Sequence, residues 1–164
     1  MSEHAAPPHN RPCSERTYSA LAVANYILQN SDTAITNLKL QKMLYFIQGF
    51  SLSRRNKPIF DDEIQAWTYG PVVPVVYREY MDYGSSPISK TAPADIIIEP
   101  DIRSFLNALI NSMRGYSAAD LVRMTHLSDT PWSTIWDNGR GRFNRIPISL
   151  IKDYFDRKLS TANG

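Results

Sequence analysis

The feature that most constrains the fold is a stripe of apolar residues at three- and four-residue spacing within residues 100–113. Its members are Ile102, Phe105, Leu106, Leu109, Ile110 and Met113. An α-helix brings residues at this spacing onto one face. Pro100 suits the first turn of such a helix, and Gly115 supplies a stop signal just after it. The spacing therefore predicts a helix that must bury one face against the rest of the protein.

Five further segments show the same helical spacing. They cover residues 17–30, 36–50, 74–84, 117–125 and 147–159. Thr36 is placed to cap the second of these helices. Ser117 and Asp120 have the spacing of a capping box, which marks the start of another. Helices are therefore expected to make up most of the structure.

The helix expected over residues 36–50 has one apolar face, formed by Leu40, Met43, Leu44, Ile47 and Phe50. Lys39, Lys42 and Gln48 fall mainly on the opposite side. Such a division is typical of a helix that packs on one side and is solvated on the other.

Residues 58–69 interrupt the helical pattern. The stretch is short, contains aromatic and β-branched residues and is punctuated by Pro and Asp, which predicts one or two short strands. Gly70 and Pro71 predict a turn at the end, and we expect Gly70 to adopt a backbone conformation that a Cβ atom would obstruct. The expected fold is mainly α: a compact bundle of about six helices with a small β element near residues 58–69.

The length of 164 residues fits a single domain, and 43% hydrophobic residues supply enough material for its core. Residues 1–16 are polar and read as a flexible leader, residues 17–159 as the folded domain, and residues 160–164 as a frayed tail. The beginning of the chain lacks the apolar stretch of a signal peptide, and no apolar run approaches the ~18 residues of a membrane span. No membrane partner and a cytoplasmic location are expected.

The charge balance argues against a dedicated nucleic-acid-binding protein. Eighteen Lys and Arg residues face sixteen Asp and Glu residues, for a net charge of +2. Nucleic-acid-binding domains usually carry a strongly basic face. Two local basic clusters consist of Arg54, Arg55 and Lys57, and of Arg140, Arg142 and Arg145. Both lie in expected loops, where solvated arginines are common, so nucleic acid is an unlikely partner.

Few residues suggest catalysis or metal binding. Cys13 is the only cysteine, which excludes a multi-cysteine zinc site, and His4 and His9 lie in the expected leader. Neither a phosphate-binding loop nor a dinucleotide-binding, nucleophile-elbow or zinc-protease motif is present. We therefore expect no cofactor, no metal and no enzymatic activity.

Two polar features leave alternatives open. His126 has Asp120 and Asp129 nearby in sequence, yet a single histidine beside carboxylates is more often a hydrogen-bonded structural residue than a ligand or base. The acidic run 61–63 could hold a cation, and a polar turn before a strand is the favoured interpretation.

The aromatic content is high, with nine Tyr, six Phe and three Trp residues. Trp67 and Trp132 both stand next to expected turns. Such rings are either part of the core or line a groove, since Trp, Tyr and Arg are enriched in protein-binding hot spots. Periodicity does not separate these two possibilities.

Four segments in order carry a resemblance to a known family. They read TNLKLQKMLYFIQGFSL, PIFDDEIQAWTYGPVVPVVYREY, GYSAADLVRMTHLSDTPW and IPISLIKDYF. Together they resemble the Panacea domain family, which includes SocA-like antitoxins and GepA-like phage-associated proteins. The resemblance covers about residues 17–157. The matching positions are Leu40, Gln41, Lys42, Tyr45, Ala66, Trp67, Tyr69, Gly70, Pro71, Val72, Pro74, Tyr77, Thr125, His126, Pro131 and Trp132.

The resemblance implies an antitoxin of a type II toxin–antitoxin system. Such a protein neutralises a cognate toxin, encoded by a neighbouring gene, through direct protein contact. It also implies a possible second role as an adaptor that delivers the toxin to a ClpXP-type protease. Within the matching positions, the candidate toxin-binding residues are Lys42, Trp67, Tyr69 and Trp132.

Two other functions stay open at this stage. The arginines in the expected loops allow a DNA-binding transcriptional regulator of a mobile element. An enzyme that acts on a small metabolite ranks third, because no group of residues suggests a mechanism.

Overall fold

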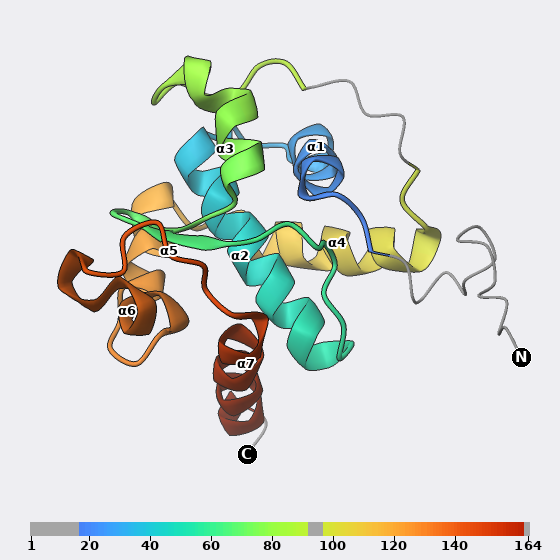
Figure 1. Ribbon diagram of the computed structural model, residues 1–164. Coiled ribbons are helices and arrows are strands. Elements are labelled where there is room, and N and C mark those ends of the chain that lie inside the picture. Colours follow the sequence, from blue (N-terminus) through green and yellow to red (C-terminus); the bar gives the residue numbers. More distant parts are fainter. Residues whose placement is uncertain (1–16, 92–96, 163–164) are drawn as a thin grey trace, which may run out of the picture.

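Helix α2 (Asn37–Arg54) lies at the centre of the computed structural model, which describes residues 17–91 and 97–162 (Figure 1). Its neighbours are α1 (Ala20–Asn30), α3 (Pro74–Tyr80), α4 (Pro100–Met113), α5 (Ala118–Thr125), α7 (Ile148–Ala162) and strand β2 (Gly70–Val72). In the view of Figure 1, α1 and α4 lie to one side of α2, and α5 lies to the other. The expected leader, residues 1–16, falls outside the described residues, and the proposed domain division stays a prediction.

The mainly α class is confirmed, and the described residues form seven α-helices rather than about six. The additional helix is α6 (Pro131–Trp136), which is too short to show apolar periodicity. Its start signal was nevertheless present in the sequence. Thr130 caps the helix by accepting a hydrogen bond from Ser133 N at 3.1 Å, and Pro131 occupies the first turn.

The other predicted helix starts are confirmed. Thr36 accepts a hydrogen bond from Lys39 N at 3.2 Å and so caps α2. Ser117 and Asp120 form the predicted capping box at α5. These local bonds satisfy backbone N–H groups that have no partner inside the helix.

The predicted polar face of α2 is wrong, because α2 is buried on nearly all sides. Lys39, Lys42 and Gln48 are all buried. The chain after α2 folds back along the helix and supplies backbone partners for its polar side chains. Gln48, for example, donates to Phe60 O at 2.8 Å and accepts from Ile59 N at 2.9 Å. Polar side chains are tolerated inside a protein when such partners are present.

The small β element is an antiparallel hairpin of β1 (Gln65–Trp67) and β2. The turn lies at Thr68 and Tyr69, two residues earlier than predicted, because Gly70 and Pro71 already pair with β1. The chain near residue 144 runs along the other edge of β1, where Phe143 N donates to Ala66 O at 2.7 Å.

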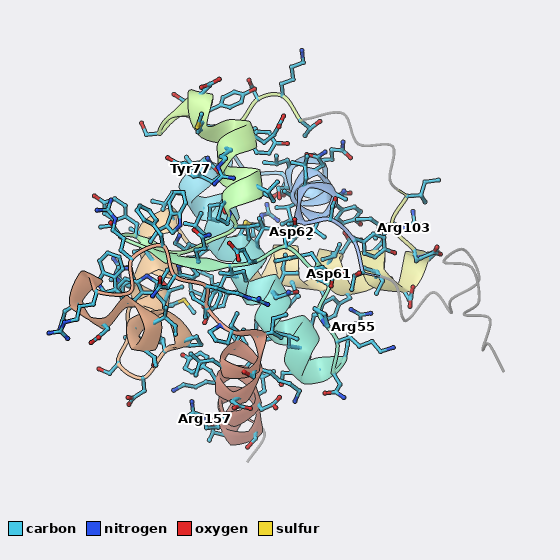
Figure 2. All side chains as sticks on the ribbon, in the orientation of Figure 1. Arg55, Asp61, Asp62, Tyr77, Arg103 and Arg157 are labelled. Carbon is cyan, nitrogen blue, oxygen red and sulfur yellow. The ribbon has the colours of Figure 1, made fainter. Side chains whose placement is uncertain are left out.

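The acidic run at residues 61–63 serves the fold. Asp61 accepts a hydrogen bond from Thr17 at 2.7 Å, and Asp62 accepts one from Ala20 N at 2.7 Å (both carboxylates are labelled in Figure 2). These bonds agree with the polar-turn interpretation. Within residues 17–91 and 97–162, no group of three or more His, Cys, Asp or Glu residues is arranged to hold a metal ion. In the same ranges, no helix combines the length and the apolar character that a membrane span requires.

Candidate protein-binding groove

A groove of about 470 Å³ lies between the first half of α2, the hairpin, α3 and the loop at residues 142–143. We call it the aromatic groove. Its lining consists of Asn37, Leu38, Gln41, Lys42, Trp67, Thr68, Tyr69, Val72, Tyr77, Gly84, Ser85, Arg142 and Phe143. These residues come from distant parts of the chain, so the groove exists only in the folded protein.

Aromatic rings form one wall of the groove. The Trp67 ring packs edge-on against Tyr77, with 4.8 Å between ring centroids (Tyr77 is labelled in Figure 2), and against Phe143 at 5.4 Å. Tyr69 at the hairpin turn is 66% exposed and Phe143 is 52% exposed. Large rings with this exposure offer apolar area to a partner.

Phe143 is held in an unusual backbone conformation. Its φ angle is +68°, in the left-handed region that bulky side chains rarely adopt. Backbone strain of this kind concentrates at functional sites. The Arg142 guanidinium lies 4.7 Å from the centre of the Phe143 ring, a cation–π distance. The loop therefore presents one ring and one cation together at the groove.

Three side chains of neighbouring elements hold the hairpin in place. Lys42 Nζ donates to Pro71 O at 2.9 Å, and Gln41 Oε1 accepts from Val73 N at 2.9 Å. The indole N–H of Trp132 donates to Trp67 O at 2.7 Å. All three bonds reach the backbone, so they set the position of the hairpin rather than of one side chain.

Lys42 is fully buried, with 0% of its surface exposed. Burial lowers the pKa of its ammonium from the ordinary value of 10.5 to about 7. Among the described residues, its only hydrogen-bond partner is Pro71 O. Gly70, with φ of +110°, lies directly against this side chain, as predicted for a position that a Cβ atom would obstruct. A Cβ atom there would lie 2.8 Å from Lys42 Cε.

His126 lies under the same hairpin. Its ring stacks on Trp132 with 3.8 Å between centroids. Burial, and then the nearby charge of Lys42, lower the pKa of His126, while a hydrogen bond to the backbone of Tyr69 opposes this shift. The imidazole contacts these groups rather than Asp120 or Asp129, the neighbours that the sequence offered.

The structure brings three of the four candidate binding residues into the lining of the groove: Lys42, Trp67 and Tyr69. Trp132 lies behind the hairpin and is 6% exposed. Its contacts with Trp67 O and with the His126 ring make it a support of the groove. The role of all four residues in toxin binding stays a prediction.

Sequence reasoning did not name four other lining residues as binding candidates. These are Leu38, Tyr77, Arg142 and Phe143. Tyr77 stood only among the positions that match the family, and Arg142 only in a basic cluster of an expected loop. The available signal was Phe143 itself, a lone large ring in an expected loop of Asn, Gly and Arg residues, where burial is not expected.

The groove offers contact area to a partner. Its one buried ionisable group, Lys42, bonds to a backbone carbonyl. An apolar concave surface with Trp, Tyr and Arg at its edge is typical of a site that binds another protein.

Comparisons with known proteins agree on one family. The family described as "Antitoxin SocA-like, Panacea domain" matches residues 40–133, which include most of the groove. Antitoxin SocA of Caulobacter vibrioides (strain NA1000 / CB15N) is 35% identical over 158 residues, covering 85% of this chain and 84% of the relative. No solved structure matched the chain. The chain therefore belongs to the SocA-like antitoxin family with a Panacea domain, as the ordered motifs of the sequence indicated.

Proposed function

We propose that this protein neutralises a cognate toxin by binding it directly, and that the aromatic groove is the contact surface. The observation that carries the proposal is the gathering of exposed and half-buried rings at one concave site. Trp67, Tyr69, Tyr77 and Phe143 line the same groove, together with Arg142. Trp, Tyr and Arg residues dominate the energetics of protein interfaces.

The rigidity of the groove also supports the proposal. Lys42 and Trp132 hold the hairpin by bonds to its backbone, and Phe143 N bonds to Ala66 O. A binding surface that is already in place loses less conformational entropy when its partner arrives. All three contacts come from segments that precede or follow the hairpin by tens of residues.

The chemistry of the groove describes the toxin segment that fits it. The rings of the groove are complementary to an apolar or aromatic segment of the toxin. The guanidinium of Arg142 is complementary to a carboxylate or carbonyl group beside that segment. We therefore propose that the toxin inserts an apolar side chain between Tyr69 and Phe143, with an acidic residue near Arg142.

Co-expression with the product of the adjacent gene tests this proposal. The toxin should copurify with the wild-type protein, and growth should be restored. Tyr69→Ala should weaken the complex by at least about tenfold, because truncating an interface hot spot costs about 2 kcal/mol or more. Its thermal unfolding should be nearly unchanged, since the Tyr69 ring is mostly exposed.

Tyr116→Ala is the matched control, because Tyr116 is also an exposed tyrosine (45%) but does not line the groove. It should bind the toxin as tightly as wild type. If Tyr69→Ala binds the toxin as tightly as Tyr116→Ala does, the aromatic groove is not the contact surface. An unbound and harmless neighbour, together with tight binding of the protein's own promoter DNA, would favour the transcriptional regulator instead.

The adaptor role for a ClpXP-type protease is a separate part of the proposal. In the same co-expression strain, removal of the protease should raise the level of the toxin only when this protein is present. If removal of the protease does not change the toxin level, direct neutralisation is the sole mechanism. An enzymatic activity is not part of the proposal.

A further inference from the structure

Phe143 is an exception among the residues with a positive φ angle. Eight described residues adopt such an angle, which bulky side chains rarely do. Three of them are glycines and four are Asn or Asp, the residue types that tolerate this conformation. The eighth is Phe143, with φ of +68°. A bulky aromatic side chain therefore stands at a position where the local backbone favours Gly or Asn.

Backbone contacts around residue 143 impose this conformation. Asn144 N donates to Gly141 O at 2.9 Å and closes a four-residue turn in which Phe143 is the third residue. A positive φ at this place in a turn is usually provided by Gly or Asn. Phe143 N donates to Ala66 O at 2.7 Å, and a Cβ atom at Gly141 would overlap Ile135 O. These contacts use no atom of the Phe143 ring, so another side chain at this position would have the same backbone.

The Phe143 ring is not part of the core. The residue is 52% exposed and lies outside the cluster of buried residues. Its ring packs against Trp67 and the guanidinium of Arg142, and all three residues line the aromatic groove. A half-exposed ring gains only part of the free energy that complete burial provides. Packing within this chain therefore does not explain a phenylalanine at a strained position.

We propose that Phe143 is an anchor residue for the toxin, and that the fold holds its exposed ring at the groove at the expense of folding stability. The inference rests on the proposed function of the groove and deepens it, because it gives one residue opposite effects on folding and on binding. The fixed backbone also favours an anchor, since a ring that is already in place loses less conformational entropy when the partner binds.

Phe143→Asn separates the two effects in the full-length protein. Asn adopts the left-handed conformation readily, so the variant relieves strain while it removes the ring. Its thermal and urea unfolding midpoints should be at least as high as those of the wild-type protein. Its affinity for the toxin, the co-expressed product of the adjacent gene, should fall by about tenfold or more. A purely structural ring would lower the unfolding midpoints as well.

Two further variants at the same position sharpen the test. Phe143→Gly relieves the strain without a polar side chain, and it should repeat the result of Phe143→Asn. Phe143→Tyr keeps both the ring and the strain, so its unfolding midpoints and its toxin affinity should stay close to those of the wild-type protein. The ring, rather than the size of the side chain alone, then accounts for the loss of binding.

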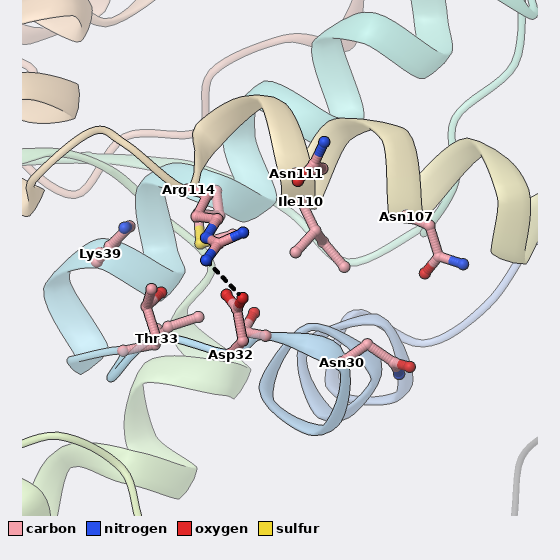
Figure 3. A pocket seen from close by; sticks show the side chains of 11 residues that line it. Asn30, Asp32, Thr33, Lys39, Asn107, Ile110, Asn111 and Arg114 are labelled. Carbon is pink, nitrogen blue, oxygen red and sulfur yellow. Dashed lines mark ion pairs between the residues drawn. The ribbon is translucent and has the colours of Figure 1, made fainter.

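Tyr116→Asn is the matched control. Tyr116 is exposed to a similar degree (45%), has no positive φ and does not line the groove. It lies just beyond the end of α4, two residues after Arg114, whose ion pair with Asp32 at 2.8 Å is drawn in Figure 3. This substitution relieves no strain and removes no groove contact. It should neither raise the unfolding midpoints nor weaken the toxin complex.

Photo-cross-linking gives a direct readout of contact. A p-benzoylphenylalanine residue in place of Phe143 should cross-link to the toxin in the complex, because the exposed ring faces the partner. The same residue in place of Tyr116 should not cross-link. A cross-link from position 116 but not from position 143 would contradict the proposal.

Two results would overturn the role of Phe143 and leave the groove in place. The first is a variant without the ring that binds the toxin as tightly as the wild-type protein, while Tyr69→Ala binds more weakly. The second is a clear drop in the unfolding midpoints of Phe143→Asn and Phe143→Gly, because the ring then stabilises the fold. If Tyr69→Ala and Phe143→Asn both bind with unchanged affinity, or if no toxin binds, the proposed function of the groove fails, and this inference fails with it.

Discussion

Lys39 and Lys42 stand three residues apart on one face of α2, yet their ammonium groups have different surroundings. Lys42 lies under the hairpin, bonds to Pro71 O and supports an apolar surface of exposed rings. The carbon chain of Lys39 is buried, whereas its ammonium lies beside polar groups and is only partly enclosed. The comparison teaches that the depth of the ammonium group decides its role. The enclosed ammonium of Lys42 holds the hairpin, while Lys39 extends its ammonium toward water.

The pH dependence of stability should separate the two lysines most strongly. The pKa of Lys42 is about 7 in the folded protein and about 10.5 when unfolded, so between these values the unfolded chain binds more protons. The stability of the wild-type protein should therefore gain as pH rises above about 7. The gain reaches about 4 kcal/mol over three pH units, at about 1.36 kcal/mol per unit.

Urea unfolding at pH 6.5, 8.0 and 9.5 checks this expectation. Lys42→Met should flatten the pH dependence, because the group that titrates is gone. Lys39→Met should flatten it in the same direction but less, since burial also lowers the pKa of Lys39. Parallel curves for Lys42→Met and the wild-type protein would show that Lys42 stays charged or is solvated in the fold.

Two glycines extend the comparison to the backbone. In Gly70→Ala the new Cβ atom would lie 2.8 Å from both Lys42 Cε and Thr125 Oγ1, at a φ of +110°. The clash and the strained φ should together lower the free energy of unfolding by about 2–4 kcal/mol. Gly115 follows Arg114 just after the end of α4, and a Cβ atom there meets nothing within 4 Å.

Gly115→Ala should accordingly change stability by less than about 1 kcal/mol. Thermal and urea unfolding of the two variants give the comparison. If both variants lose the same free energy of unfolding, the close contact between Gly70 and Lys42 does not stabilise the hairpin.

The smallest expected effect concerns the support of the groove. Trp132→Phe keeps a ring beside His126 but removes the donor to Trp67 O, which should cost about 1–2 kcal/mol. Toxin binding should weaken as well, since the hairpin loses a fixed point.

Trp136→Phe is the control, because its ring stacks on Trp132 at 5.3 Å while its indole N–H has no partner among the described residues. Stability and toxin affinity should be measured for both variants. If Trp136→Phe loses more stability and toxin affinity than Trp132→Phe, ring stacking rather than the hydrogen bond to Trp67 O supports the hairpin.

Local signals predicted the helices well, because helix starts and apolar stripes depend on residues close in sequence. The stripe on α4 and the capping box of Ser117 and Asp120 are examples. The prediction was less complete where contacts between distant residues determine which side chains are buried. The polar face expected for α2 is buried, and the chain from Lys57 to Tyr77 supplies partners for Lys42 and Gln48: Gln48, for example, donates to Phe60 O at 2.8 Å.

The candidate site shows the same division. Trp67 and Tyr69 could be named from their place beside a turn, and the ordered motifs indicated the family. Phe143 and Arg142 joined the groove only because residues 143–146 bond along β1, some eighty residues earlier in the chain. No spacing within either segment encodes that pairing.

The sequence by itself determined the mainly α class, the helix starts, the need for glycine at position 70 and the family. Each of these depends on neighbouring residues or on the order of motifs along the chain. The tertiary structure decided which side chains face one another: it enclosed the Lys42 ammonium beside a carbonyl and left the Lys39 ammonium only partly enclosed. Both lysines have the same chemistry and neighbouring places on one helix face, and only the elements packed against each of them make them different.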